Sequence, residues 1–214
     1  PGEITLAHNG VLFLDELTEF RRNVLETLRQ PLEEGRITIS RARAVCTYPA
    51  RFQLVAAMNP CPCGYAGDGR RPCTCTPLQR RRYRGRLSGP LLDRIAIHVR
   101  VRAVDSAADR ARATGDSAGM ASAVAEAAAR QRRRFDGDGV VRRNADITAA
   151  SLERYCRLDA TARMLLGEVS RRMRLSARRT AHVMRVARTI ADLEGAEEVA
   201  SRHVAEATSS APSR

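Results

Sequence analysis

GVLFLDEL, residues 10–17, is the stretch of this sequence that decides its fold. Four bulky apolar residues, Val11–Leu14, run directly into the adjacent carboxylates of Asp15 and Glu16. A short continuous apolar run is typical of a buried strand in a parallel sheet. Open α/β sheets bind ligands at the carboxyl ends of such strands, so the acid pair predicts a ligand site. A strand that ends at an exposed acidic turn is the alternative, and this stretch alone does not exclude it.

The composition bounds the class of protein. The 214 residues suffice for one large or two small domains, and 43% hydrophobic with 4% aromatic residues predicts an aliphatic, Ala-rich core. A formal charge of +13 favours a polyanionic partner such as nucleic acid, although an Arg-rich composition bias explains it equally well. Without a membrane-length apolar run or a signal peptide, we expect a cytoplasmic protein with no membrane partner. Because the chain begins inside a patterned segment, we interpret it as a fragment lacking its N-terminal part.

Apolar periodicity predicts an α/β region followed by an all-α region. Phe20, Val24, Leu25, Leu28 and Leu32 lie on one face of a helix expected from about residue 19 to 35. Further along the chain we expect a hairpin at 36–50, a buried strand at 51–59, and a helix and a strand within 87–101. Ser176 is the expected N-cap of a helix over 177–194, which Gly195 ends. The expected domains are 1–102 (α/β core), 103–142 (linker and helix), 143–208 (all-α lid) and 209–214 (disordered tail).

Three later polar residues fit the site that the acid pair predicts. Asn59 ends the next apolar run and can orient a hydrolytic water if the two strands are neighbours. Arg94 follows a short helical segment and can reach a neighbouring subunit's γ-phosphate, and Arg178 lies in the first turn of a later helix. In phosphate-loop ATPases an acid placed like Asp15 holds Mg²⁺, and the next acid, here Glu16, polarises the attacking water. For each arginine taken singly, a solvated surface charge is the alternative.

Together these stretches resemble AAA+ ATPases of the magnesium-chelatase-like class and, within it, the ComM/YifB subfamily. The similar stretches are GEITLAHNGVLFLDELTEF, LRQPLEEGRITISRA, PARFQLVAAMNPCPCGY, CTCTPLQRRRYRGRLSGPLLDRI and LSARRTAHVMRVARTIADLEG. The resemblance implies an incomplete AAA+ P-loop NTPase core with a small all-α lid. It implies Walker B at Asp15 and Glu16, sensor 1 at Asn59, an arginine finger at Arg94 and sensor 2 at Arg178.

The resemblance also implies a function. It implies a homo-oligomeric ring, expected to be a hexamer, that hydrolyses ATP with Mg²⁺ and acts on single-stranded or branched DNA as a branch-migration helicase. Two positions depart from the family, since Ala96 replaces a usual acid and Thr18 a usual Pro. The phosphate loop, Gly-x-x-x-x-Gly-Lys-Ser/Thr, appears nowhere in the 214 residues, so we expect these residues alone to be inactive.

Four cysteines form a candidate metal site. Cys61, Cys63, Cys73 and Cys75 make two C-x-C pairs separated by nine residues, and four thiolates can close a tetrahedral structural zinc site. Four reduced loop thiols without metal are the alternative, whereas a disulfide is less expected without a secretion signal. The resembling subfamily carries the same insertion. Cys46 and Cys156 are expected to be ordinary small buried residues.

Basic segments offer candidate contacts with DNA. Arg80, Arg81 and Arg82 precede Tyr83, and arginines with one aromatic residue suit a phosphate backbone and a stacked base. A solvated or inter-subunit surface is the alternative. By resemblance, Arg41 and Arg43 lie on a hairpin that projects into the ring's pore. A second basic run, at residues 130–135, is expected to be the solvent-facing end of a helix.

Two other functions stay open at this point. A magnesium-chelatase ATPase subunit would share the acid pair and the arginine finger, but the cysteine insertion disfavours it. A zinc-stabilised nucleic-acid-binding module without catalysis is also compatible with a chain that lacks the phosphate loop.

Overall fold

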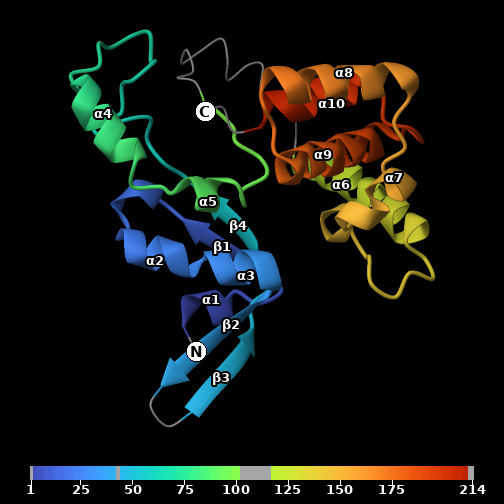
Figure 1. The fold of residues 1–214 in the computed structure, drawn as a ribbon, viewed down its shortest axis with the longest axis horizontal. Helices are drawn as coiled ribbons and strands as arrows, with labels where there is room; N and C mark the ends of the chain where they lie inside the picture. The colour runs from blue at the N-terminus through green and yellow to red at the C-terminus, as the bar shows by residue number, and fades with distance from the viewer. Residues whose placement is uncertain (1, 42–43, 102–116, 212–214) are drawn as a thin grey trace. The chain divides into compact units, whose positions relative to one another are not determined.

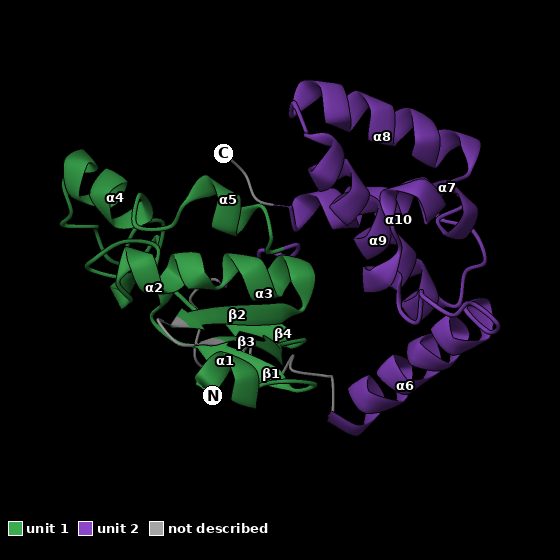
Figure 2. Cartoon of the chain, turned by 60° about the horizontal axis from the view of Figure 1, so that its bottom comes forward, with its two compact units in different colours: residues 1–95 green, residues 96–214 purple. Residues whose placement is uncertain are grey.

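The chain divides into two compact units, residues 1–95 and 96–214, and each unit is described by itself (Figure 2). A computed structural model describes residues 2–41, 44–101 and 117–211. Residues 103–116, the first part of the region expected to be a linker and helix, and the last three residues of the expected tail therefore lie outside the described residues. Within the described residues, no helix combines the length and the apolar character that a membrane crossing needs.

A two-stranded parallel sheet organises the first unit. Strand β1, Val11–Leu14, pairs with β4, Gln53–Ala56, in a register that places Leu14 opposite Ala56 (Figure 1). Parallel strands end at the same edge of a sheet, so the residues after β1 and after β4 lie side by side. The parallel arrangement predicted from the two apolar runs is confirmed.

The expected hairpin is also confirmed. Strands β2, Arg36–Arg41, and β3, Ala44–Pro49, pair in antiparallel register, and Figure 1 shows them projecting from the rest of the unit. Gly35 precedes β2 with φ +65°, and a Cβ there would lie 2.8 Å from Cγ of Arg51. A side chain at position 35 would therefore meet both backbone strain and a close contact.

The single helix expected after the acid pair is instead three short segments: η1, Leu17–Glu19; α2, Arg22–Thr27; and α3, Arg29–Glu34. Pro31 has no N–H to donate to the carbonyl of Thr27, which explains the break. Leu25 and Leu28 are buried as expected, but Phe20 and Val24 are exposed. The remaining helices of the unit are α1, Glu3–Leu6; α4, Pro77–Arg84; and α5, Gly89–Leu92.

The expectation of fully buried strands is wrong. Val11 and Phe13 are each 59% exposed, whereas Leu12 and Leu14 pack against a group of buried leucines. Among the described residues, elements of this unit cover only one face of the sheet. The covered face meets the unit 1 core, which consists of Leu17, Leu25, Leu28, Leu87 and Leu91.

The strand expected at the end of residues 87–101 does not form. Residues 95–101 have no regular structure, and Val99 and Val101 are largely exposed. The backbone N–H and C=O groups of a strand need hydrogen-bond partners on a neighbouring strand, and no described strand pairs with this segment. Its His98 N–H instead donates to the carbonyl of Ser210, over 2.7 Å.

The second unit is all-helical, as expected. Ser176 caps α9 by accepting a hydrogen bond from the N–H of Arg179, and Gly195, with φ +76°, ends the helix. The helix α10 includes Ser209, so the expected disordered tail begins with a helical residue. The elements are α6, Ser117–Arg134; η2, Asn144–Asp146; η3, Ala149–Ser151; α7, Leu152–Tyr155; α8, Ala160–Arg172; α9, Ala177–Glu194; and α10, Ser201–Ser209.

A buried ionic network holds α6 against α9. The Asp192 carboxylate is fully buried and accepts hydrogen bonds from Arg134 and Asn144, 2.8 Å each, while Arg188 lies 3.0 Å away. Arg130 donates to the backbone carbonyl of Asp192 over 2.9 Å. The expectation that this basic run only faces solvent is therefore wrong, because Arg130 and Arg134, on successive turns of α6, both contact Asp192 of α9.

Candidate functional site

The acid pair and Asn59 lie at one edge of the parallel sheet. The N–H of Ala57 donates to the carbonyl of Leu14, and the N–H of Leu17 donates to the carbonyl of Ala57, both over 2.9 Å. Asp15 and Glu16 thus run alongside the residues that follow β4, and Asn59 lies three residues beyond that strand. All three side chains are exposed, so their oxygen atoms are accessible to a ligand.

Glu16 has an uncommon backbone conformation. Its φ of 48° and ψ of 46° lie in the left-handed region, which residues other than glycine seldom adopt. Oδ1 of Asp15 accepts the Glu16 N–H over 2.8 Å, and the Glu16 carbonyl accepts the N–H of Glu19 over 2.7 Å. Such strain gathers at functional sites, and here it coincides with the predicted catalytic acid.

Arg94 lies in the turn after α5 and is held within its own chain. Nη2 of Arg94 forms an ion pair with Glu33 on α3, and Nη1 donates to the carbonyl of Pro90 over 2.6 Å. The Arg94 side chain is only 11% exposed. Leu91, within α5, and Leu17, directly after the acid pair, belong to the same core. The helix that precedes Arg94 and the segment next to the acids therefore share one core.

Arg178 belongs to the second unit, and the acid pair belongs to the first. Arg178 is exposed in the first turn of α9, in the second unit, and its role stays a prediction. Arg43 lies outside the described residues, as does the side chain of Arg41, the last residue of β2.

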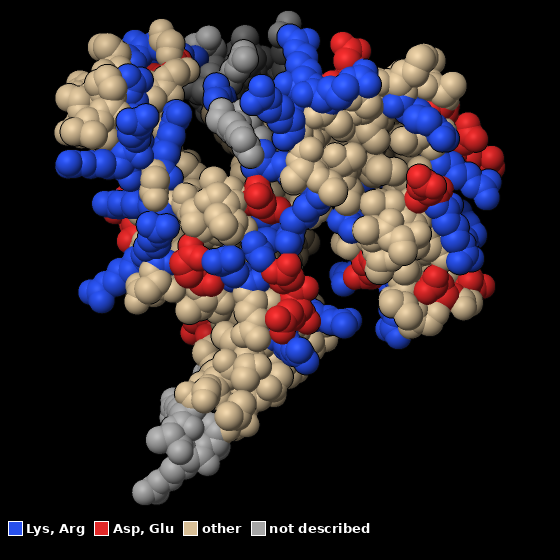
Figure 3. Space-filling model, viewed as in Figure 1, with Lys and Arg blue, Asp and Glu red and all other residues tan. Residues whose placement is uncertain are grey.

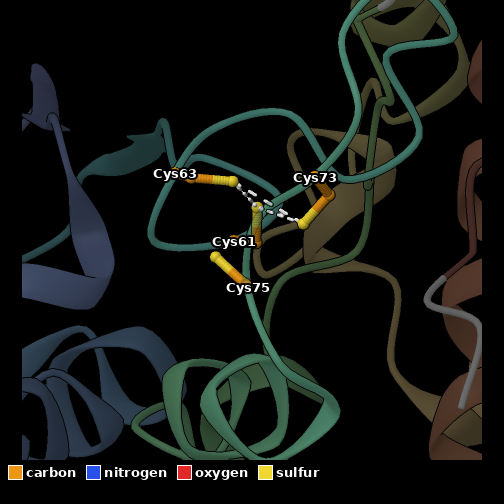
Figure 4. Close-up of side chains that lie close together, drawn as sticks. All are labelled: Cys61, Cys63, Cys73 and Cys75. Atoms are coloured by element: carbon orange, nitrogen blue, oxygen red, sulfur yellow. Dashed lines mark hydrogen bonds between the residues drawn. The ribbon is translucent and has the colours of Figure 1, made fainter.

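The four cysteines converge as the spacing predicts (Figure 4). The sulfur of Cys61 lies 3.4 Å from that of Cys63 and 3.7 Å from that of Cys73, and Cys63 lies 3.6 Å from Cys73. With Cys75, all four sulfurs lie within 4.8 Å of one another. Zinc–sulfur bonds of about 2.3 Å place tetrahedral thiolates about 3.8 Å apart. A disulfide requires about 2.0 Å. The site therefore fits a metal ion and not a disulfide.

The loop favours thiolates at part of this site. A hydrogen bond from the backbone of Tyr65, followed by smaller contributions, lowers the pKa of Cys63 to about 5. Desolvation and the hydrogen bond with Cys63 raise the pKa of Cys75 to about 12. Gly64 has φ +83°, and its N–H donates to the carbonyl of Cys61, which closes a turn that a side chain would strain.

The other two cysteines differ from each other. Cys156 is buried, as expected, and burial raises its thiol pKa to about 11. The expectation for Cys46 is wrong, because this residue is exposed on β3. Strand β3 belongs to a projecting hairpin, where small side chains have little to pack against.

Helix α4 follows the cysteine loop directly and is strongly basic. Thr76, next to Cys75, accepts the N–H of Gln79 over 3.2 Å and donates its own N–H to the Gln79 side chain, which fixes the helix start. Figure 3 shows basic side chains over α4. Arg81 and Arg82 are exposed and Arg80 is half-buried. Tyr83 is only 7% exposed, which corrects the expectation that its ring is available to stack on a base.

Sequence reasoning missed the partners of two arginines. Arg86 binds the segment just after the acid pair, where its Nη1 donates to the carbonyl of Thr18 over 2.8 Å and lies 3.0 Å from a Glu19 carboxylate oxygen. Glu33 was likewise not recognised as the partner of Arg94. These partners lie more than sixty residues apart in the chain, and no local pattern indicates such contacts.

Comparison with known proteins identifies the family. The family model "Magnesium chelatase, subunit ChlI" matches residues 1–108, and "Magnesium chelatase, subunit ChlI C-terminal" matches residues 114–210. The chain is 44% identical over 209 residues to the competence protein ComM of Haemophilus influenzae. It is 43% identical over 212 residues to the protein YifB of Salmonella typhimurium.

These matches cover nearly the whole chain but only part of each relative. They span 97% and 98% of this chain, and 40% of the length of each relative. An uncharacterized protein of Mycobacterium bovis is 43% identical over 198 residues, which are 91% of this chain and 38% of that protein. The chain therefore belongs to the magnesium-chelatase ChlI-like family and is a protein of the ComM/YifB type.

Proposed function

We propose that the complete protein is an ATP-driven AAA+ motor that remodels DNA, as a helicase that promotes branch migration during recombination or natural transformation. The observation that carries this proposal is the acid edge, where Asp15, Glu16 and Asn59 follow two paired parallel strands. One of the relatives is the competence protein ComM, which supports a role in natural transformation.

The exposed oxygen atoms at this edge suit Mg²⁺-ATP. Carboxylate oxygens are ligands that Mg²⁺ prefers, and the metal neutralises charge on the transferred phosphoryl group when the nucleotide is bound. In this proposal Asp15 holds the metal, Glu16 accepts the proton of the attacking water, and Asn59 orients that water. Arg178 contacts the nucleotide from the lid.

Arg94 is proposed to act on the nucleotide of a neighbouring subunit in a ring, which we expect to be a hexamer. Family membership supports assembly into a ring. Arg94 is paired with Glu33 in its own chain. In this proposal, the Arg94 side chain leaves the Glu33 carboxylate when it binds the γ-phosphate at a neighbouring subunit.

The cysteine site is proposed to hold structural Zn²⁺. Four thiolates complete the tetrahedral coordination of zinc, so no position is left for a catalytic water. Zinc would fix the loop between Asn59 and α4, a loop of glycines and prolines with little buried surface. Reduced thiols of this kind persist in a reducing compartment, which supports a cytoplasmic location.

DNA is proposed to bind along α4 and the hairpin. The exposed side chains of Arg81 and Arg82 can neutralise phosphates, together with Arg80, and Arg41 and Arg43 are the candidates on the hairpin. The cysteine site favours this motor over a chelatase subunit, because the resemblance gives chelatase subunits no cysteines at this position.

The DNA surface can be tested with matched double variants of the complete protein. Arg81→Ala with Arg82→Ala removes two phosphate contacts, and should reduce the salt slope of single-strand affinity by about 1.4, at about 0.7 per contact. The DNA-stimulated part of ATP turnover should fall in parallel. The control is Arg132→Ala with Arg133→Ala, an adjacent exposed pair on α6. Equal salt slopes in both double variants would show that α4 does not contact DNA.

A further inference from the structure

Arg86 connects the end of the basic helix to the segment that follows the acid pair. Its Nη1 donates to the carbonyl of Thr18 over 2.8 Å and lies 3.0 and 3.1 Å from the two carboxylate oxygens of Glu19. Arg86 is two residues beyond α4, whereas Thr18 and Glu19 belong to η1, which begins directly after Glu16. The contact thus joins the candidate DNA surface to the candidate ATP site.

The connection continues along the backbone to the predicted catalytic acid. The N–H of Glu19 donates to the carbonyl of Glu16 over 2.7 Å. Glu16 itself is in the left-handed conformation, which a residue other than glycine keeps only where its surroundings fix it. A displacement of Glu19 therefore alters the hydrogen bond that helps to fix Glu16.

The ion pair is too exposed to be important mainly for stability. The side chains of Arg86 and Glu19 are 50% and 57% exposed, and exposed ion pairs add little to the free energy of folding. Leu87, the next residue, is buried in the unit 1 core with Leu17 and anchors the same segment by apolar contact. Loss of Arg86 should consequently leave the fold intact and change the position of η1.

We propose that Arg86 is a positioning residue that transmits DNA binding on α4 to the acid pair. This inference rests on the proposed function, in which Arg81 and Arg82 hold phosphates. Helix α4 is fixed at its start by the Thr76 cap beside the cysteine site and leads at its end to Arg86. A shift of α4 on bound DNA moves the Arg86 guanidinium, which moves the η1 backbone and adjusts Glu16.

The test compares ATP turnover of the complete protein with and without single-stranded DNA. Arg86→Ala should keep the DNA affinity and the KM for ATP of the wild type, but its kcat with DNA should drop to the value without DNA. Arg86→Lys keeps the charge and can still donate hydrogen bonds but lacks the planar guanidinium, and should restore part of the stimulation. Glu19→Gln weakens the contact from the other side and should lose stimulation as well, which provides a second variant if Arg86→Ala does not fold. Arg132→Ala, an exposed arginine on α6 and outside the candidate DNA surface, is the control and should retain stimulation.

Hydrogen exchange supplies a readout that is independent of turnover. DNA should change the exchange of the Leu17–Glu19 amides in the wild type and in Arg132→Ala, but not in Arg86→Ala. Full stimulation in Arg86→Ala, or equal losses in Arg86→Ala and Arg132→Ala, would overturn this inference and leave the proposed function standing. A wild type that DNA does not stimulate would overturn both.

Discussion

At the scale of single residues, the candidate catalytic groups are held by partners. Glu16 keeps a left-handed backbone, at a cost of about 1–3 kcal/mol, while Asp15 accepts its N–H. Arg94 is held by Glu33 and by the carbonyl of Pro90. These contacts restrain the two residues that, in the proposed function, take part most directly in ATP hydrolysis.

Asp138 offers a residue-scale prediction about pH. The hydroxyl of Tyr155 donates to its carboxylate over 2.6 Å, and with the N–H groups of Val141 and Val140 this lowers the pKa of Asp138 to about 2. A carboxyl whose pKa is lowered by folding stabilises the fold above its unfolded pKa, about 3.9. That stabilisation is lost as the pH falls from about 4 to about 2.

The measurement is the thermal midpoint of the wild type and of Asp138→Asn as a function of pH. The wild type should melt at a higher temperature at neutral pH, and the difference should vanish towards pH 2. A difference that stays constant across this range would show that the Asp138 charge does not contribute.

The acids and Asn59 could be predicted because each directly follows an apolar run, and paired parallel strands bring such positions together. The contact from Arg86 to Thr18 could not be predicted, since 68 residues separate the two. Tyr83 and Cys46 were assigned to the wrong environments for a related reason. A short segment does not reveal which of its faces the rest of the chain covers.

At the scale of elements, the sequence pattern predicts correctly those elements whose backbone hydrogen bonds form within one short segment. The α9 helix begins at its Ser176 cap and ends at Gly195, and the hairpin forms in the expected region. The strand expected after α5 does not form, because its backbone needs hydrogen bonds to a partner strand. Sequence periodicity does not reveal whether such a partner is present. The break at Leu28 shows that one proline can interrupt a periodic apolar pattern that predicts a single continuous helix.

The cysteine loop gives an element-scale prediction about metal. The purified protein should contain one zinc ion per chain, and Cys63→Ser or Cys75→Ser should abolish zinc binding because a thiolate ligand is lost. Cys46→Ser is the matched control, since Cys46 is exposed on β3, outside the four-cysteine cluster. Elemental analysis with thiol titration checks this. Equal zinc content in Cys63→Ser and in the wild type would contradict the assigned site.

At the scale of the whole molecule, the division into an α/β unit and a helical unit agrees with the two family models that match its parts. All 37 basic residues are arginines, so the lysine of a phosphate loop cannot come from these residues. The proposed function therefore requires that the complete protein supplies that loop, and the relatives have more than twice the aligned length.

Residues 1–214 alone should therefore bind ATP weakly and hydrolyse none. The phosphate cradle contributes backbone N–H groups and a lysine to the β- and γ-phosphates, and without it the acid edge has no means to hold them. Phosphate release by the purified 214 residues measures this. Turnover above background, absent when Glu16→Gln is introduced, would show that these residues form a complete site.

Branch migration by the complete protein tests the central claim most directly. With Mg²⁺-ATP the wild type should convert a synthetic branched DNA to its products, and should not do so with a non-hydrolysable ATP analogue. Glu16→Gln should bind the nucleotide and the DNA but leave the branch point in place. Migration by Glu16→Gln at the wild-type rate, or the absence of ATP-dependent migration in the wild type, would contradict the account.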